Sequence, residues 1–526
     1  MTVEVREHHK APLWRNATVL KWAAQIVVLI GVVALFATLA SRAAANFEAS
    51  NVSFGWDWLS DPTGVALREG IDTLPDSGAR ALVVGIINTL RVAISGIIVA
   101  TILGTLIGIA RLSSNWIVNK IATVYIEAIR NIPLLVQIFF WSAIAVGLPD
   151  LTVDDVGEYW FKASNRGFAI AWIFPDGGFW PWMVFVVAGI VVGRRVAKMR
   201  RKHQEDTGQP GHAGRWMTLV ILVFAVIGWF AWPLLGFMEP VLDAISEFIV
   251  GWPPILVPIV IALLAVAAAA WWIRNFFESR RTPAGFGKMT DDDWFRVIFV
   301  AFSGLAIAVL AFVLAGFEVK TVRGEVLSVA ALVVDGISNL FAWMGDKFNT
   351  ENYNTVVEGV RSGGPLVFER PEVLLRGGAE IPQYGESGMI VSIPFFAIWT
   401  GVTLYTAAFI AEIVRGGILA VPKGQTEAAM AMGLKRSQYL RQIILPQAFR
   451  IILPPLGNQY LNLAKNTSLG LAVAYADIVA VGFTIINQTG QSLPVVIVWM
   501  AFFLIMSLSL SAIVNYYNRK LQLVER

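Results

Sequence analysis

The chain has 526 residues, of which 56% are hydrophobic and 15% are charged. Soluble domains carry roughly a quarter charged residues, so this composition excludes an ordinary soluble enzyme, and 12% aromatic residues exclude a disordered chain. A net charge of +4 is too small to indicate nucleic acid as a partner, and the lack of cysteine excludes disulfides and thiolate metal sites.

The apolar residues fall in blocks of about twenty, the length that crosses a bilayer core. We therefore predict an all-α, polytopic helical membrane protein with about ten transmembrane helices. The first span is predicted to be an uncleaved anchor, because no small-residue cleavage site follows it. The predicted spans lie near Leu20–Ala40, Val84–Ala110, Ala122–Val146, Trp180–Val192, Met217–Leu235, Ile255–Trp272, Val297–Phe317, Met389–Ala411, Ile443–Leu463 and Val495–Val514.

Two further segments have an ambiguous pattern. Val326–Met344 is apolar but is interrupted by Asp335 and Asn339, so we predict an interfacial or packed helix there. Whether this segment or residues 466–486 cross the membrane is left open.

The basic residues test the number of spans. With a cytoplasmic N-terminus, ten spans place the basic loops on one side, as the positive-inside rule expects, and the C-terminus is cytoplasmic too. The opposite loops, such as Asn46–Asp76, are mixed or acidic. The basic residues concerned are Arg111, Lys120, the run Arg194–Lys202, Arg274, Arg280, Arg281, Lys288, Lys423, Lys435, Arg436, Arg519, Lys520 and Arg526.

Small residues recur every fourth position on the second span. Gly96, Ala100, Gly104 and Gly108 predict a helix face that packs closely against another helix. Its predicted role is structural.

The segment after the eighth span has an unusual run of small residues. We predict a short helix over Thr426–Met432, closed by Gly433 in the left-handed conformation with Leu434 packing back on Ala429, as in a Schellman cap. A second helix is predicted to start near Ser437. Such a helix is suited to docking into a cleft of a partner, and the alternative is an ordinary connector.

At this point the sequence resembles a known family. Glu427-Ala428-Ala429, Gly433 and Ile443-x-Leu445-Pro446 resemble the EAA loop of type I ABC importer permeases. The polar amino-acid branch is indicated by further motifs at Tyr125–Gln137, Tyr405–Ile418, Val421–Gln425, Leu445–Ala448 and Lys465–Leu469.

The resemblance implies a five-span core and an ATP-driven importer of L-amino acids in the cell inner membrane. It implies three kinds of partner: a separate ABC ATPase dimer, which uses ATP and magnesium, a periplasmic amino-acid-binding protein, and a second permease subunit. The residues that it assigns to the contact with the ATPase are Glu427, Ala428, Ala429, Gly433, Leu445 and Pro446. Whether the second permease is identical or distinct stays open, and the insertion described next favours a distinct one.

The two parts of the core are separated by a long insertion. The predicted division is a tail, anchor helix and periplasmic loop at 1–83, core at 84–149, an insertion with about four extra spans at 150–388, and core with the EAA loop at 389–526. Such insertions are similar to those of general or acidic/amide L-amino-acid permeases. The insertion is either a lipid-facing collar or has a specific function.

Two charged pairs lie near the cytoplasmic ends of their predicted spans. Glu127/Arg130 and Glu412/Arg415 share an i,i+3 spacing, which puts each pair on one helix face. A charge within a bilayer normally pairs or reaches water. These residues are therefore candidates either for a gate or for packing.

A polar stripe crosses the ninth span. Asn458, Asn462 and Lys465 are spaced i, i+4 and i+7 on an otherwise apolar helix. Lipid offers no hydrogen bonds, so the stripe is predicted to face a cavity or another subunit. The candidate role is the substrate path, and the alternative is interhelical packing.

No phosphate-binding loop, metal cluster or nucleophile constellation stands out, so we predict no catalytic residue, no resident metal and no bound cofactor in this chain. The alternative function is an ion-coupled secondary amino-acid transporter. That class usually shows internal repeats, which are not evident here, and it leaves the EAA loop unexplained. A membrane enzyme is a third, weaker alternative.

Overall fold

The computed structural model describes residues 55–521, apart from 63, 68, 283–284, 287–288, 321–324, 350–363 and 377–380, together with isolated residues between 24 and 46. The isolated residues are helical. The rest of the predicted anchor helix, the tail before it and Lys288 and Arg526 lie outside the described residues.

The described part of the chain is mainly helical, as predicted. By length and composition, eight of its helices could cross a membrane, or up to ten if each of two bent pairs counts as one span. The helices are α2 (Gly78–Ala110), α3 (Trp116–Asn131), α4 (Leu134–Val146), α5 (Phe179–Thr207), α6 (Ala213–Ala231), α7 (Met238–Val250), α8 (Leu256–Ser279), α9 (Asp291–Ala315), α10 (Val329–Phe348), α11 (Ile393–Leu419), α12 (Lys423–Ala431), α13 (Arg436–Tyr439), α14 (Leu445–Asn466), α15 (Ile478–Thr489) and α16 (Ser492–Leu521).

The core is built on the contact between α2 and α11. The small residues predicted to form a packing face, Gly96 to Gly108, are buried on the side of α2 that meets α11 and α14. A Cβ atom at Gly104 would lie 2.7 Å from the carbonyl oxygen of Ala407, so the two helix backbones touch there. The prediction of a close-packing face is confirmed.

The segment Ala122–Val146, predicted as one span, is not one continuous helix. It is two helices, α3 and α4, that meet at an angle of 106°. The break falls at Pro133, which lacks an N–H group and forces the preceding Ile132 into an extended conformation (φ −95°, ψ 128°).

Other predicted boundaries shift as well. The span predicted to begin at Met389 begins at Ile393, because Ser392 caps the helix by accepting a hydrogen bond from the N–H of Phe395 (3.1 Å). The span near Trp180–Val192 is part of α5, which continues through the basic run to Thr207.

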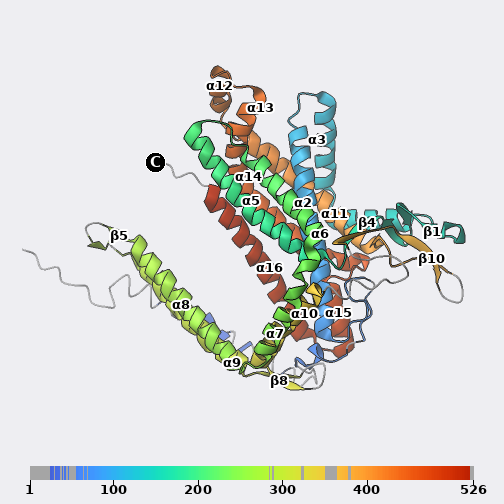
Figure 1. Cartoon of the computed structure of the whole chain (residues 1–526), viewed down its shortest axis with the longest axis vertical. Coiled ribbons are helices and arrows are strands. Elements are labelled where there is room, and N and C mark those ends of the chain that lie inside the picture. The colour runs from blue at the N-terminus through green and yellow to red at the C-terminus, as the bar shows by residue number, and fades with distance from the viewer. Residues whose placement is uncertain are drawn as a thin grey trace, which may run out of the picture.

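The insertion forms antiparallel helix pairs. α5 packs against α6, α8 against α9, and α7 against α10. Ser246 of α7 and Ser338 of α10 are buried and joined by hydrogen bonds of 2.9 Å. The segment predicted to be interfacial or packed is thus a packed helix, α10, although it is long and apolar enough to span a membrane. In Figure 1, α8 extends away from the core helices.

Short strands, which an all-α prediction leaves out, join the two ends of the insertion. All described pairings are antiparallel, in the orders β1-β10-β11, β12-β3-β2 and β4-β9, with two separate hairpins, β5-β6 and β7-β8. The strands are β1 (Gly157–Glu158), β2 (Phe161–Ser164), β3 (Gly167–Ile170), β4 (Trp172–Pro175), β5 (Arg281–Thr282), β6 (Gly285–Phe286), β7 (Glu318–Lys320), β8 (Val326–Ser328), β9 (Leu366–Glu369), β10 (Glu372–Arg376), β11 (Ile381–Tyr384) and β12 (Met389–Val391).

Candidate functional site

The segment between α11 and α14 contains the predicted docking helix. α12 begins after Pro422 and ends at Ala431, so it starts three residues earlier than predicted. Gly433 has φ +73°, its N–H donates to the carbonyl of Met430 (2.9 Å), and the N–H of Leu434 donates to the carbonyl of Ala429 (3.2 Å). This pair of bonds defines a Schellman cap, which confirms the predicted closure of the helix.

α12 contacts the rest of the chain along a narrow side. Ala429 is buried against the protein, whereas Glu427 and Ala428 are exposed. Met430 and Met432 are 53% and 79% exposed, and flexible thioether side chains adapt well to a partner surface. Figure 1 shows α12 at one end of the molecule, beyond the core helices.

The connection from α12 to α14 differs from the prediction in detail. α13 begins at Arg436, so Ser437 lies within the helix and is not its N-cap. The N–H of Lys435 instead donates to the side-chain oxygen of Gln438 (2.8 Å). A π-helical turn over Leu440–Ile444 then leads into α14, whose first two residues are Leu445 and Pro446. A proline there is tolerated because the first turn of a helix needs no donor.

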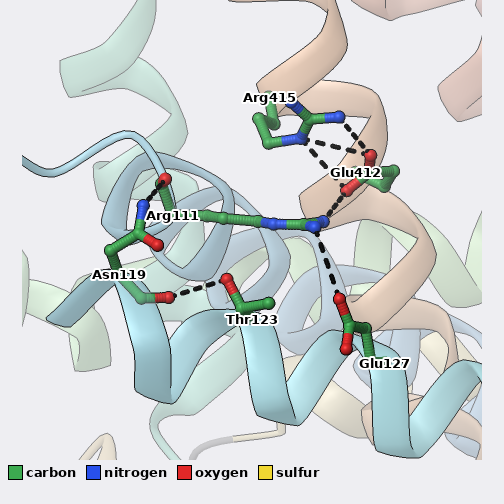
Figure 2. A network of polar contacts seen from close by, with 6 residues as sticks. All are labelled: Arg111, Asn119, Thr123, Glu127, Glu412 and Arg415. Atoms are coloured by element: carbon green, nitrogen blue, oxygen red, sulfur yellow. Dashed lines mark hydrogen bonds and ion pairs between the residues drawn. The ribbon is translucent and has the colours of Figure 1, made fainter. Parts of the chain in front are cut away.

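A cluster of charged side chains lies where α2, α3 and α11 meet (Figure 2). The guanidinium of Arg111, just after α2, contacts Glu412 of α11 and lies 3.9 Å from the carboxylate of Glu127 in α3. Arg415 also binds Glu412, with nitrogen–oxygen distances of 2.5 to 3.2 Å. The cluster links three helices, and α11 leads directly into α12.

One predicted pair forms and the other does not. Glu412 and Arg415 pair along α11, but Glu127 pairs with Arg111 and not with Arg130. The guanidinium of Arg130 lies over the ring of Phe409, 5.1 Å from its centroid. Spacing along one helix identified the acids but not their partner, because Arg111 comes from a different segment.

The polar stripe on α14 faces away from the core. Asn458, Asn462 and Lys465 are all exposed, and none of their side chains forms a hydrogen bond with another described residue. The opposite side of α14 is buried through Leu456, Leu463 and neighbouring residues. Water, substrate or another chain must therefore satisfy the stripe within a membrane.

Polar contacts at the opposite end of α2 were not predicted. Asn88 donates to the carbonyl of Ala476 (2.9 Å), Tyr475 donates to the carbonyl of Asn88 (2.8 Å), and Thr89 accepts from the N–H of Ile478 (3.0 Å). These bonds join α2 to the start of α15. Their partners are nearly four hundred residues apart, so no local motif marks them.

The fold and these features define a polytopic helical membrane protein with an exposed, capped helix between two core helices. No protein-family profile matches the chain. The chain is 31% identical, over 95% of its length and 92% of the relative, to the general L-amino acid transport system permease protein AapQ of Rhizobium johnstonii. It belongs to the family of amino-acid ABC transporter permeases.

Two other relatives differ in how much of this chain they match. The glutamate/glutamine/aspartate/asparagine transport system permease protein BztB of Rhodobacter capsulatus is 31% identical over 95% of this chain and 93% of its own. The glutamine transport system permease protein GlnP of Escherichia coli is 37% identical over 25% of this chain and 60% of its own. Long relatives thus match nearly throughout, and a short relative matches over a quarter of this chain.

Proposed function

We propose that this chain is the permease subunit of an ATP-driven importer that carries L-amino acids across the cell inner membrane. The observation that carries the proposal is the exposed, Schellman-capped α12 in a chain of this family. The names of AapQ and BztB support L-amino acids as the substrate class. Nothing in the described structure favours an ion-coupled secondary transporter.

α12 is the proposed contact with a separate ABC ATPase dimer, which supplies the hydrolysis of ATP. Exposed residues of α12 and its C-cap, including Glu427, Ala428 and Met432, would contact the ATPase. Buried Ala429 would anchor the helix to the permease. Gly433 would fix the direction that the chain takes after α12, and with it the orientation of α12 on the permease. Because Glu412 and Arg415 lie at the end of α11, the charged cluster is suited to pass a displacement of α12 to α2 and α3 (Figure 2).

The proposed cytoplasmic side is the end that carries α12. The turn between α5 and α6 lies at the same end in Figure 1 and follows the basic run of α5. The positive-inside rule supports this orientation, with both termini in the cytoplasm. The strands β1 to β4 and α15 would then lie on the periplasmic side, where a binding protein delivers the substrate.

A second permease subunit is proposed to face the stripe on α14. The amide groups of Asn458 and Asn462 and the ammonium of Lys465 would line a path between the two subunits. An amino acid has a carboxylate and an ammonium group, and both require polar partners in a path through lipid. The exposure of the stripe in the single chain supports this arrangement.

Single cysteines test the orientation, since the chain has none of its own. Cysteine at Lys423 or Glu427 should react with an impermeant maleimide only from the cytoplasmic side, and cysteine at exposed Glu158 of β1 only from the other side. Labelling of Lys423→Cys from the periplasm would contradict the orientation. Uptake into proteoliposomes containing the ATPase should require ATP and persist when ionophores collapse ion gradients, whereas loss with the ionophores would favour the secondary transporter.

A further inference from the structure

The cytoplasmic half of α5 carries five cations on one side of the helix. The residues Arg194, Arg195, Lys198, Arg201 and Lys202 follow the spacing i, i+1, i+4, i+7 and i+8, which covers about one third of the circumference of an α-helix. All five are exposed. We call this set the α5 cationic stripe.

The stripe points away from the partner helix. Gly193 and Ala197 are buried on the opposite side of α5, where a Cβ atom at Gly193 would lie 3.1 Å from the carbonyl oxygen of Met217 in α6. Arg200 also turns to that side and lies over the ring of Trp216, 4.4 Å from its centroid. One cation of the basic run thus fastens α5 to α6, and the other five face outward.

One acidic residue, Glu205, lies on the same side of α5, one turn after Arg201. None of the five members of the stripe forms an ion pair with a described residue. By contrast, Arg274 pairs with Glu278 (3.0 Å) and Arg280 with Asp293 (2.7 Å) in the α8–α9 pair. The stripe is therefore a concentrated positive surface, and its first three cations, Arg194, Arg195 and Lys198, have no acidic residue within one turn of α5.

The same side of α5 is apolar in the half nearer its start. Trp180, Val184, Val187 and Val191 continue the line of the stripe, and they are 40% to 52% exposed. Arg194 lies about 21 Å along the helix axis from Trp180, and Lys202 lies about 33 Å from it. The stripe therefore covers the depth at which a bilayer core of about 30 Å gives way to headgroups.

We infer that the outward side of α5 binds an anionic phospholipid. The acyl chains would lie along Val184, Val187 and Val191, and the phosphate would contact Arg194, Arg195 and Lys198. A basic cluster directly beside a transmembrane helix attracts acidic lipids, and an arginine fork binds phosphate with two hydrogen bonds. The inference rests on the membrane-spanning fold and is independent of the transported substrate.

The positive-inside rule alone does not account for this arrangement. It explains why cations gather on one side of the membrane, but any distribution around the helix would satisfy it. The five unpaired cations on one side suit the anionic headgroup of a phospholipid, and the exposed apolar residues in line with them suit its acyl chains. The lipid would hold the α5–α6 pair at a fixed depth.

The purified full-length chain provides a test by native mass spectrometry in mixed micelles of phosphatidylglycerol and phosphatidylcholine. The wild-type chain should retain phosphatidylglycerol at least about tenfold better than phosphatidylcholine, and salt should weaken this preference. The triple variant R194Q/R195Q/K198Q should lose the preference, because each cation near a headgroup contributes about a fivefold gain in affinity. R194K/R195K should keep most of it.

R274Q/K347Q/R519Q is the matched control, because it removes the same charge at three scattered positions and should bind as the wild type does. Equal retention of both lipids by the wild-type chain would overturn the inference without reference to any variant. So would a triple glutamine variant that keeps the preference for phosphatidylglycerol. If that variant keeps its lipid but loses a copurifying protein subunit, the stripe is a protein-docking surface and the inference is wrong.

Discussion

The guanidinium of Arg111 contacts the carboxylate of Glu412, although the two residues are 301 positions apart in the sequence. Their side chains are 20% and 27% exposed, so the pair is partly shielded from solvent. It joins the end of α2 to the last part of α11, which continues into α12. A change at this contact should therefore affect both the stability of the core and the position of α12.

Replacing either residue should destabilise the protein measurably. A charged hydrogen bond contributes about 1.5–3 kcal/mol, and Arg111→Gln and Glu412→Gln should each lower the free energy of unfolding by an amount in that range. The double variant should cost less than the sum of the single changes. Thermal unfolding of the four proteins in detergent provides the comparison, and strictly additive effects would mean that the pair does not interact.

Gly433→Val should abolish transport while the permease stays inserted and folded. The left-handed conformation at φ +73° is strongly disfavoured for a β-branched residue, although no atom lies within 4 Å of the position of a Cβ there. Backbone strain, and not a clash, is thus the expected cause. The measurement is ATP-driven uptake in vesicles together with copurification of the ATPase.

Gly208 is a matched control for that substitution. It closes α5 with φ +70° and also has open space around it. Gly208→Val should cost about 1–2 kcal/mol of local strain yet leave uptake near the wild-type rate. Equal loss of uptake in both variants, or normal uptake by Gly433→Val, would show that the cap on α12 has no special role in coupling.

Asn462→Leu should reduce uptake about fivefold to tenfold, the effect of losing one hydrogen bond in a polar path, with little change in assembly. Asn515→Leu is the comparison, since Asn515 is also exposed but lies on a different helix, α16. Initial rates of amino-acid uptake would separate the two. Normal transport by Asn462→Leu would reassign the stripe to packing between subunits.

The strands near the start of the insertion should respond to acid through Asp155. The hydrogen bond from Lys162, together with the N–H of Thr152 (2.9 Å), lowers the pKa of Asp155 to about 2. A lowered pKa in the folded state means that the carboxylate stabilises the fold above about pH 4, and that this contribution is lost as the pH falls toward 2.

Asp155→Asn should therefore increase amide exchange in β2 and β3 at pH 6, and the difference from the wild type should be smaller at pH 3. Hydrogen exchange followed by mass spectrometry measures both. Asp154→Asn should have no effect, because exposed Asp154 forms no ion pair with another described residue. A difference that is the same at both pH values would exclude a role for the charge of Asp155.

Local sequence patterns predicted a helical feature correctly where the pattern alone determines the structure. The spacing of Gly96 to Gly108 requires a close helix contact, and Gly433 next to Leu434 specifies a cap. The break at Pro133 was missed because the apolar run continues through it. The strands were missed because each is short, and because β1 and β4 pair with strands roughly two hundred residues away.

The same limit applies to the candidate site. Periodicity placed Asn458, Asn462 and Lys465 on one side of α14, and the structure leaves that side uncovered. Periodicity could not predict that Arg111 pairs with Glu127 and Glu412, because that contact depends on how three separate helices come together. Roles in coupling and in the substrate path remain predictions.

The pairing of β4 with β9 brings Pro175 opposite Leu366, so the chain enters and leaves most of the insertion at adjacent points. The helices α5 to α10 are therefore connected along the chain to the core through this one pair of strands. A tight turn could replace that stretch without displacing α4 or α11. We expect a chain shortened in this way to keep the contact between α2 and α11.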